Sequence, residues 1–134
     1  MTLKITISLL DNNQFKLHGM ENVDGLTPKE LMLYAAAKCA GLTVLSILKE
    51  HTSSITNFEI SIEGRLSTPT PVAESRFLHF NIIYNIECPT LKDQIVISRA
   101  VNLAHDKYCG VLQMYRQIAP VMHETSIVST EDRN

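Results

Sequence analysis

Two of the three cysteines in this 134-residue chain, Cys39 and Cys109, lie in contexts that suit thiol chemistry. A thiolate can attack an oxidant, and two thiols that meet can close a disulfide. The third cysteine, Cys88, precedes Pro89 at a predicted strand end, and we interpret it as structural because free cysteines are usually buried. The odd count and the lack of a short repeated spacing argue against a disulfide scaffold and a CxxC zinc site.

Cys39 lies within a long apolar segment, residues 31–48, that is predicted to be helical. At about 100° per residue, several mostly small side chains share the helix face of Cys39. They are Met32, Ala35, Ala36, Thr43 and Ser46. Because small neighbours let another helix approach closely, a cysteine on that second helix could come within disulfide reach.

Cys109 is the best partner, because Cys109 and Gly110 interrupt one predicted helix just before a shorter one. Backbone N–H groups of the following turn are expected to point at the sulfur and lower its pKa. His105, four residues earlier, could polarise this thiol, lie at the helix surface, or share a metal with Cys109. Two ligands do not make a site and the other histidines lie in separate segments, so we predict no metal and no cofactor.

The order of predicted elements is strand, strand, helix, strand, strand, helix, helix, strand. Thr27 and Thr90 are predicted to cap the first two helices. The approximate ranges are residues 3–9, 14–18, 28–50, 58–66, 78–86, 91–108, 111–118 and 121–129, followed by a polar tail to residue 134. The core-facing stripe predicted for the second helix is Ile97, Ala100, Val101, Ala104 and Tyr108. Hairpin-length connections between strands predict an α+β fold in a single domain, residues 1–134.

Charge and composition narrow the possible partners. A formal net charge of −2 without a Lys/Arg cluster argues against nucleic acid as a partner. The start MTLKITISLLDNN differs from a signal peptide, so we predict a cytoplasmic protein. Residues 31–48 could span a membrane by length, but the central Lys38 and the flanking charges favour a buried helix. That helix is apolar nearly all round, so we expect a second helix or a second subunit to cover its outer face.

Two segments of the chain resemble the signature cysteine segments of OsmC/Ohr proteins. The first segment reads TPKEL at residues 27–31 and AAKC at residues 36–39, and the second reads AHDKYCGV at residues 104–111. Neither segment alone is very specific, but the two occur together in the family order. The surrounding order of strands and helices extends the resemblance over nearly the whole chain.

The resemblance implies an OsmC-like α+β fold in which antiparallel sheets wrap around long central helices of an intertwined homodimer. It also implies two active sites at the subunit interface, where a thiolate attacks an organic hydroperoxide. Carried over by position, Cys39 would be the peroxidatic thiol that becomes a sulfenic acid, and Cys109 the resolving thiol that condenses with it. An external dithiol would then reduce the disulfide.

Two positions depart from the family pattern. Family peroxidases carry a Glu ten residues before the first cysteine and an Arg in an early strand, whereas here that position is Lys29 and no Arg precedes Arg65. The neighbouring Glu30 lies about 180° round the helix from Cys39 and can instead complete a capping box with Thr27. We retain Lys29 and Glu30 as candidate catalytic residues. The candidates to replace the Arg are Lys4, Lys16 and His18.

Two functions are therefore open. The leading hypothesis is a dithiol hydroperoxide reductase, because both cysteines stand in family-like contexts. The alternative is a non-catalytic member of the same fold that binds a small apolar ligand or senses redox state, since the Arg is missing and the Glu is displaced. A pure binding protein would not need two thiols that can meet, which favours the enzyme.

Overall fold

The structure is a computed structural model that describes residues 1–49, 55–70 and 72–130. Predictions that fall on the other residues, including the end of the first helix at Glu50 and most of the polar tail, lie outside the described residues. The elements are β1 (Thr2–Leu9), β2 (Phe15–Leu17), the 3-10 helix η1 (Val23–Gly25), α1 (Pro28–Lys49), β3 (Asn57–Leu66), β4 (Phe77–Cys88), α2 (Leu91–Leu103), the π-helix η2 (Ala104–Tyr108), α3 (Gly110–Tyr115) and β5 (Val121–Ser129).

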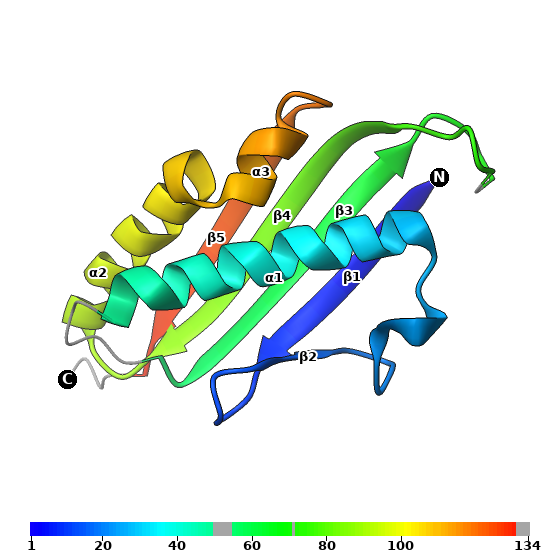
Figure 1. Cartoon of the computed structure of the whole chain (residues 1–134). Helices are drawn as coiled ribbons and strands as arrows, with labels where there is room; N and C mark the ends of the chain where they lie inside the picture. The colour runs from blue at the N-terminus through cyan, green and yellow to red at the C-terminus, as the bar shows by residue number, and fades with distance from the viewer. Residues whose placement is uncertain (50–54, 71, 131–134) are drawn as a thin grey trace.

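The strands form one sheet in the order β2-β1-β3-β4-β5, with the helices on one face (Figure 1). The three pairs that do not involve β5 are antiparallel, whereas β5 runs parallel to β4. The predicted α+β class is confirmed, but the expectation of wholly antiparallel pairing is wrong at this last strand. The reason is the long helical crossover from β4 to β5, which returns the chain to the end of the sheet where β4 began.

The core lies between the sheet and the helices. α1 packs against β1 and β3, while α2 packs against β4 and β5. The inward side chains of the central strands are buried because apolar residues alternate there with polar ones, as predicted. They are Ile5, Ile7, Phe58, Ile60, Ile62, Phe80, Ile82, Tyr84 and Ile86. On the opposite face the hydroxyls of Thr6 and Ser61 hydrogen-bond across β1 and β3 at 2.9 Å.

Side-chain caps begin the two longer helices where the sequence predicts. The Thr27 N–H donates to Glu30 Oε1 at 3.0 Å, and the Glu30 N–H donates to Thr27 Oγ1 at 3.3 Å. This reciprocal pair is a capping box, and it satisfies two amides that the helix itself leaves unpaired. The Asp93 N–H donates to Thr90 Oγ1 at 3.1 Å, which starts α2 in the same way.

α1 is the central helix of the core. It is long and apolar enough to cross a membrane by length and composition. Its inner face is nevertheless fully buried against the sheet through Leu33, Ala36, Ala40 and Val44, which agrees with the predicted core helix. α2 and α3 pack against one side of α1, as a second helix was expected to do. Leu42 on the outer face nevertheless remains 44% exposed, so the described residues leave part of this face uncovered.

A π-helical turn joins α2 to Cys109. η2 continues the helix, and Cys109 then adopts an extended backbone (φ −79°, ψ 102°) before α3 begins at Gly110, so the predicted break is confirmed. The wider π-turn rotates the following side chains out of the α-helical phase. The predicted buried stripe therefore stops at Ala104. Tyr108, expected to continue the stripe, is 55% exposed, while His105 is buried in its place.

Candidate active site

The sulfurs of Cys39 and Cys109 meet at the junction of α1, η2 and α3. Their Sγ atoms are 3.1 Å apart, and the Cys109 S–H donates to the Cys39 sulfur. Both cysteines are free thiols in this structure. Because a small movement of either side chain would bring the sulfurs to bonding distance, the prediction that these two thiols can meet is confirmed.

The two thiols differ in their access to solvent. Cys109 is fully buried, whereas Cys39 is half-buried and opens into a pocket of about 990 Å³. Ala35, Thr43 and Ser46, three of the residues predicted to share its helix face, line this pocket together with Cys39. The larger side chains around it are Tyr34, Lys38, Leu42, Ile47, Leu103 and Tyr108. A molecule that enters from solvent therefore meets Cys39 first.

Burial controls the protonation of Cys109. Burial first, and then the hydrogen bond to Cys39, raises the pKa of the Cys109 thiol to about 12. Backbone N–H groups of Leu112 and Val111 point at the sulfur and lower this pKa, as the helix start predicts, but they do not outweigh burial. The predicted net lowering is wrong because the sequence pattern shows the donors but not the depth of the sulfur. Cys109 is thus a thiol at neutral pH.

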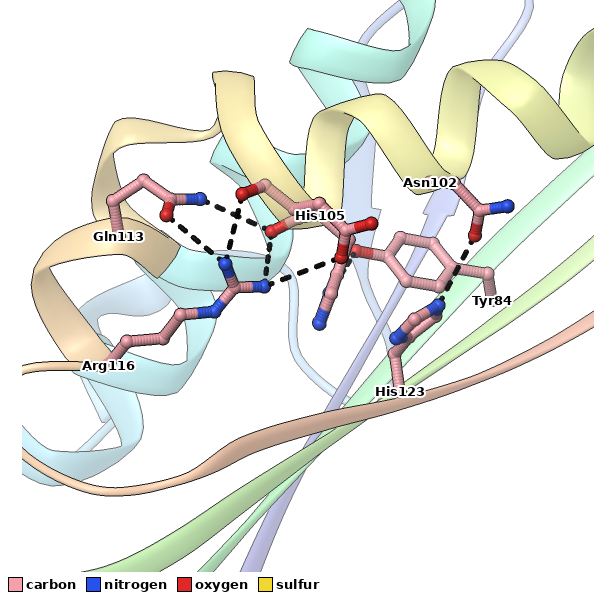
Figure 2. A network of polar contacts seen from close by, with 7 residues as sticks. Tyr84, Asn102, His105, Gln113, Arg116 and His123 are labelled. Atoms are coloured by element: carbon pink, nitrogen blue, oxygen red, sulfur yellow. Dashed lines mark hydrogen bonds and ion pairs between the residues drawn. The ribbon is translucent and has the colours of Figure 1, made fainter.

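His105, on the π-turn that precedes Cys109, lies in a polar cluster with Tyr84 of β4 and His123 of β5 (Figure 2). His105 is only 2% exposed, so its predicted alternative place at the helix surface is wrong. Its Nδ1 lies 3.5 Å from the Tyr84 hydroxyl, and its ring lies against that of His123, with the centroids 3.9 Å apart and the planes tilted by 35°. Burial, followed by the charge of His123, lowers the pKa of His105 to about 4. His105 is therefore neutral at pH 7.

Tyr84 is the member of this cluster whose pKa is affected by both thiols. Burial, followed by the charge of Cys109, raises the pKa of the Tyr84 hydroxyl above its ordinary range. The sequence pattern places Tyr84 on the inward face of its strand, which is confirmed, but its polar role beside the thiols was not predicted, although one signal was available. It carries a polar end on a strand face that is otherwise apolar, between Ile82 and Ile86. A buried tyrosine hydroxyl needs a hydrogen-bond partner, and His105 provides it.

Lys29 and Glu30 lie in the first turn of α1, whereas Cys39 lies at its middle. The Lys29 Nζ donates to the carbonyls of Val72 and Ala73, each at 3.2 Å. Ten residues of α-helix separate Lys29 from Cys39, which corresponds to about 15 Å along the axis. Within one chain neither side chain reaches the sulfurs, and the catalytic role of Lys29 and Glu30 stays a prediction.

The cations proposed to replace the missing Arg also lie away from the thiols. Lys4 and Lys16 alternate with inward residues, so they extend from the sheet face opposite the helices. Lys4 lies 3.9 Å from Glu63, and His18 hydrogen-bonds Ser8. Lys38, one residue before Cys39, does line the thiol pocket, although the sequence pattern did not single it out as a substitute for the Arg.

His105 and Cys109 do not form the start of a metal site in this geometry. The polar contacts of His105 are with Tyr84 and the Val121 backbone, while Cys109 turns toward Cys39. In residues 1–49, 55–70 and 72–130, no group of three His, Cys, Asp or Glu side chains is arranged to hold a metal ion. Cys39 and Cys109 therefore form a dithiol site.

Comparison with known proteins agrees with this geometry. The family profile described as OsmC-like protein matches residues 19–124. Protein YhfA of Escherichia coli K12 is 27% identical over 117 residues, which cover 87% of this chain and 84% of YhfA. A hypothetical protein from Aquifex aeolicus VF5 has a similar fold, with a TM-score of 0.65 and 21% identity over 99% of this chain and 100% of that chain.

A further solved structure has a functional name. It is an organic hydroperoxide resistance protein OsmC from Legionella pneumophila, with a TM-score of 0.53 and 16% identity over 96% of this chain and 97% of that chain. At this identity the likeness shows the fold alone. The family match, in contrast, spans most of the sequence and includes both cysteine segments, so this chain belongs to the OsmC-like protein family.

Proposed function

We propose that this protein reduces organic hydroperoxides, with Cys39 as the peroxidatic thiol and Cys109 as the resolving thiol. The observation that carries the proposal is the 3.1 Å approach of the two sulfurs, of which only Cys39 opens to the pocket. Membership of the OsmC-like family and the name of the L. pneumophila protein support the same chemistry.

The first step is attack by the Cys39 thiolate on the terminal oxygen of the hydroperoxide. An S–O bond forms while the O–O bond breaks, and the released alkoxide takes a proton and leaves as the alcohol. Cys39 is thereby oxidised by two electrons to a sulfenic acid. The apolar side chains of Leu42, Ile47 and Leu103 in the pocket suit the organic group of the substrate.

The second step is condensation of the two cysteines. Cys109 gives up its proton and its sulfur attacks the Cys39 sulfur, so that an S–S bond forms, the S–O bond breaks, and hydroxide leaves as water after protonation. Since Cys109 is buried and its pKa is raised to about 12, it does not compete with Cys39 for the hydroperoxide. An external dithiol then reduces the disulfide and restores both thiols.

Counting thiols tests this proposal directly. One equivalent of cumene hydroperoxide should remove two of the three free thiols, because Cys39 and Cys109 pair while Cys88 stays buried. The count is made with a chromogenic thiol reagent after denaturation. Intact mass should fall by two hydrogen atoms and return after treatment with a dithiol. Three thiols that persist after excess hydroperoxide would contradict the proposal.

Binding of a small apolar ligand is the second candidate, because the pocket beside Cys39 measures about 990 Å³ and is largely apolar. The family-type Arg is missing from the early strands, which also fits a member that binds or senses rather than catalyses. The thiol count separates the two functions, since a ligand-binding member would keep its thiols in hydroperoxide.

We also propose that the protein is a homodimer, in which the second copy covers the outer face of α1. Leu42, Leu103 and Tyr108 surround the thiol pocket and are 44%, 44% and 55% exposed, which is a large apolar area to leave in water. Light scattering after size exclusion should give twice the chain mass of 15.0 kDa, and Leu42→Glu should lower it toward one chain. A monomer at micromolar concentration would overturn this proposal.

A further inference from the structure

Arg116 follows α3 and reaches back to η2, the turn that precedes Cys109 (Figure 2). Its guanidinium donates to the His105 carbonyl at 2.5 Å and to the Asp106 carbonyl at 3.1 Å. It also donates to the Gln113 side-chain oxygen at 3.1 Å. One side chain therefore joins the segment before Cys109 to the segment after it.

The π-turn explains why these carbonyls are available to a side chain. The Cys109 N–H donates to the Ala104 carbonyl at 2.9 Å, whereas an α-helix would pair it with His105. The backbone then leaves the helical conformation at Cys109. Carbonyls at a helix end need partners from outside the helix. Arg116 supplies them, and Gln113 Nε2 adds a second bond to the His105 carbonyl at 3.2 Å.

We propose that Arg116 is a positioning residue for Cys109, because it holds the π-turn that places the Cys109 sulfur against Cys39. This inference rests on the proposed function, in which Cys109 carries out the resolving step. The planar fork of arginine can serve two carbonyls at once, and hydrogen bonds from a charged donor are stronger than neutral ones. Loosening this turn would leave Cys39 in place on α1 and separate the sulfurs.

Arg116 acts by position rather than by its charge on the thiol. The causes that shift the pKa of Cys109 are burial, Cys39 and the backbone N–H groups of α3. The charge of Arg116 instead lowers the pKa of Tyr84 and of His105. Lysine at this position would keep the charge and lose the fork, so it separates the two roles.

The test is to equilibrate the protein with mixtures of reduced and oxidised glutathione and to measure the fraction of chains that contain the Cys39–Cys109 disulfide. This fraction gives the effective concentration of one thiol relative to the other, and no hydroperoxide is needed. Arg116→Met should lower this effective concentration about tenfold, equivalent to about 1.4 kcal/mol. Arg116→Lys should recover only part of the loss. Arg99→Met is the matched control, because Arg99 is an exposed arginine on α2 that lines a different surface groove, and it should match the wild type.

A second measurement follows the two chemical steps separately. In Arg116→Met, Cys39 should be oxidised by cumene hydroperoxide at the wild-type rate, while the sulfenic acid persists longer and is captured by dimedone. Gln113→Met removes the bond from Gln113 to the His105 carbonyl and one acceptor of Arg116, but it leaves both Arg116 bonds to the η2 carbonyls, so it should show a smaller effect in the same direction. Circular dichroism and thermal unfolding check the fold of each variant. If Arg116→Met does not fold, the single variants Arg116→Lys and Gln113→Met still test the inference.

The outcomes separate this inference from the proposed function. Equal glutathione equilibria for the wild type and every Arg116 and Gln113 variant would overturn the positioning role. Wild-type thiols that resist hydroperoxide, while the equilibrium still shifts in Arg116→Met, would overturn the peroxidase and leave the positioning role supported. Full rescue by Arg116→Lys would show that charge rather than the fork is what matters, which contradicts the inference.

Discussion

Cys39→Ser is expected to abolish the reaction with organic hydroperoxide, with a rate loss of about a thousandfold or more. A serine hydroxyl is not ionised at neutral pH and is a poor nucleophile without a neighbouring base. Cys109 cannot substitute, since it is fully buried and its pKa is raised to about 12. Rapid-quench measurement of cumene hydroperoxide consumption, paired with a thiol count, gives the rate.

Cys109→Ser, in contrast to Cys39→Ser, should still react with hydroperoxide but should fail to form the disulfide. Cys39 is still oxidised in this variant, but the sulfenic acid has no partner at 3.1 Å and accumulates, so dimedone should label one site per chain. Cys88→Ser is the matched control. Cys88 is buried and its S–H reaches the carbonyls of Thr90 at 3.5 Å and Val128 at 3.7 Å, away from the thiol pair. That variant should therefore retain the complete cycle.

A reversed pattern would assign the roles the other way. If Cys109→Ser were inert and Cys39→Ser still consumed hydroperoxide, the buried sulfur would have to be the nucleophile. Such a result would require an opening of η2 and α3, because Cys109 has no access to the pocket in the described structure.

Local signals in the sequence predicted most of the fold. The caps at Thr27 and Thr90, the alternation along β1, β3 and β4, and the break at Cys109 each depend on neighbouring residues alone, and all are confirmed. The direction of β5 could not be predicted in this way. An alternating strand pattern reads the same in both directions, so only the crossover and the packing of α2 determine whether β5 runs parallel to β4.

The meeting of the two thiols was predictable because it depends on helix geometry and small neighbours. The pKa of Cys109 was not, since it depends on how deeply the folded chain buries the sulfur. The exposed Tyr108 and buried His105 depend on a single π-turn, which shifts the phase of the helix without a clear sequence signal. Arg116 lies seven residues beyond Cys109, and only the backward fold of α3 brings it to η2.

Acid should destabilise this protein through His105. The unfolded histidine has a pKa near 6.5 and takes up a proton as the pH falls, whereas burial and His123 hold the pKa of His105 in the folded chain at about 4. The unfolded state therefore binds more protons between pH 6.5 and pH 4, and the free energy of unfolding declines on acidification through that window. The full loss is about 3 kcal/mol, of which about 2 kcal/mol is reached at pH 5.

Urea unfolding at pH 7 and at pH 5 measures this loss, with His105→Gln as the test variant. Glutamine does not titrate, and it can still accept from the Tyr84 hydroxyl and donate to the Val121 backbone, so the variant should lose much less stability between the two pH values. His79→Gln, at an exposed position on β4, should keep the wild-type pH dependence. Equal pH dependence in His105→Gln and the wild type would contradict this prediction. It would show that His105 is protonated or solvated in the folded protein, because only a buried neutral imidazole has a pKa well below that of the unfolded chain.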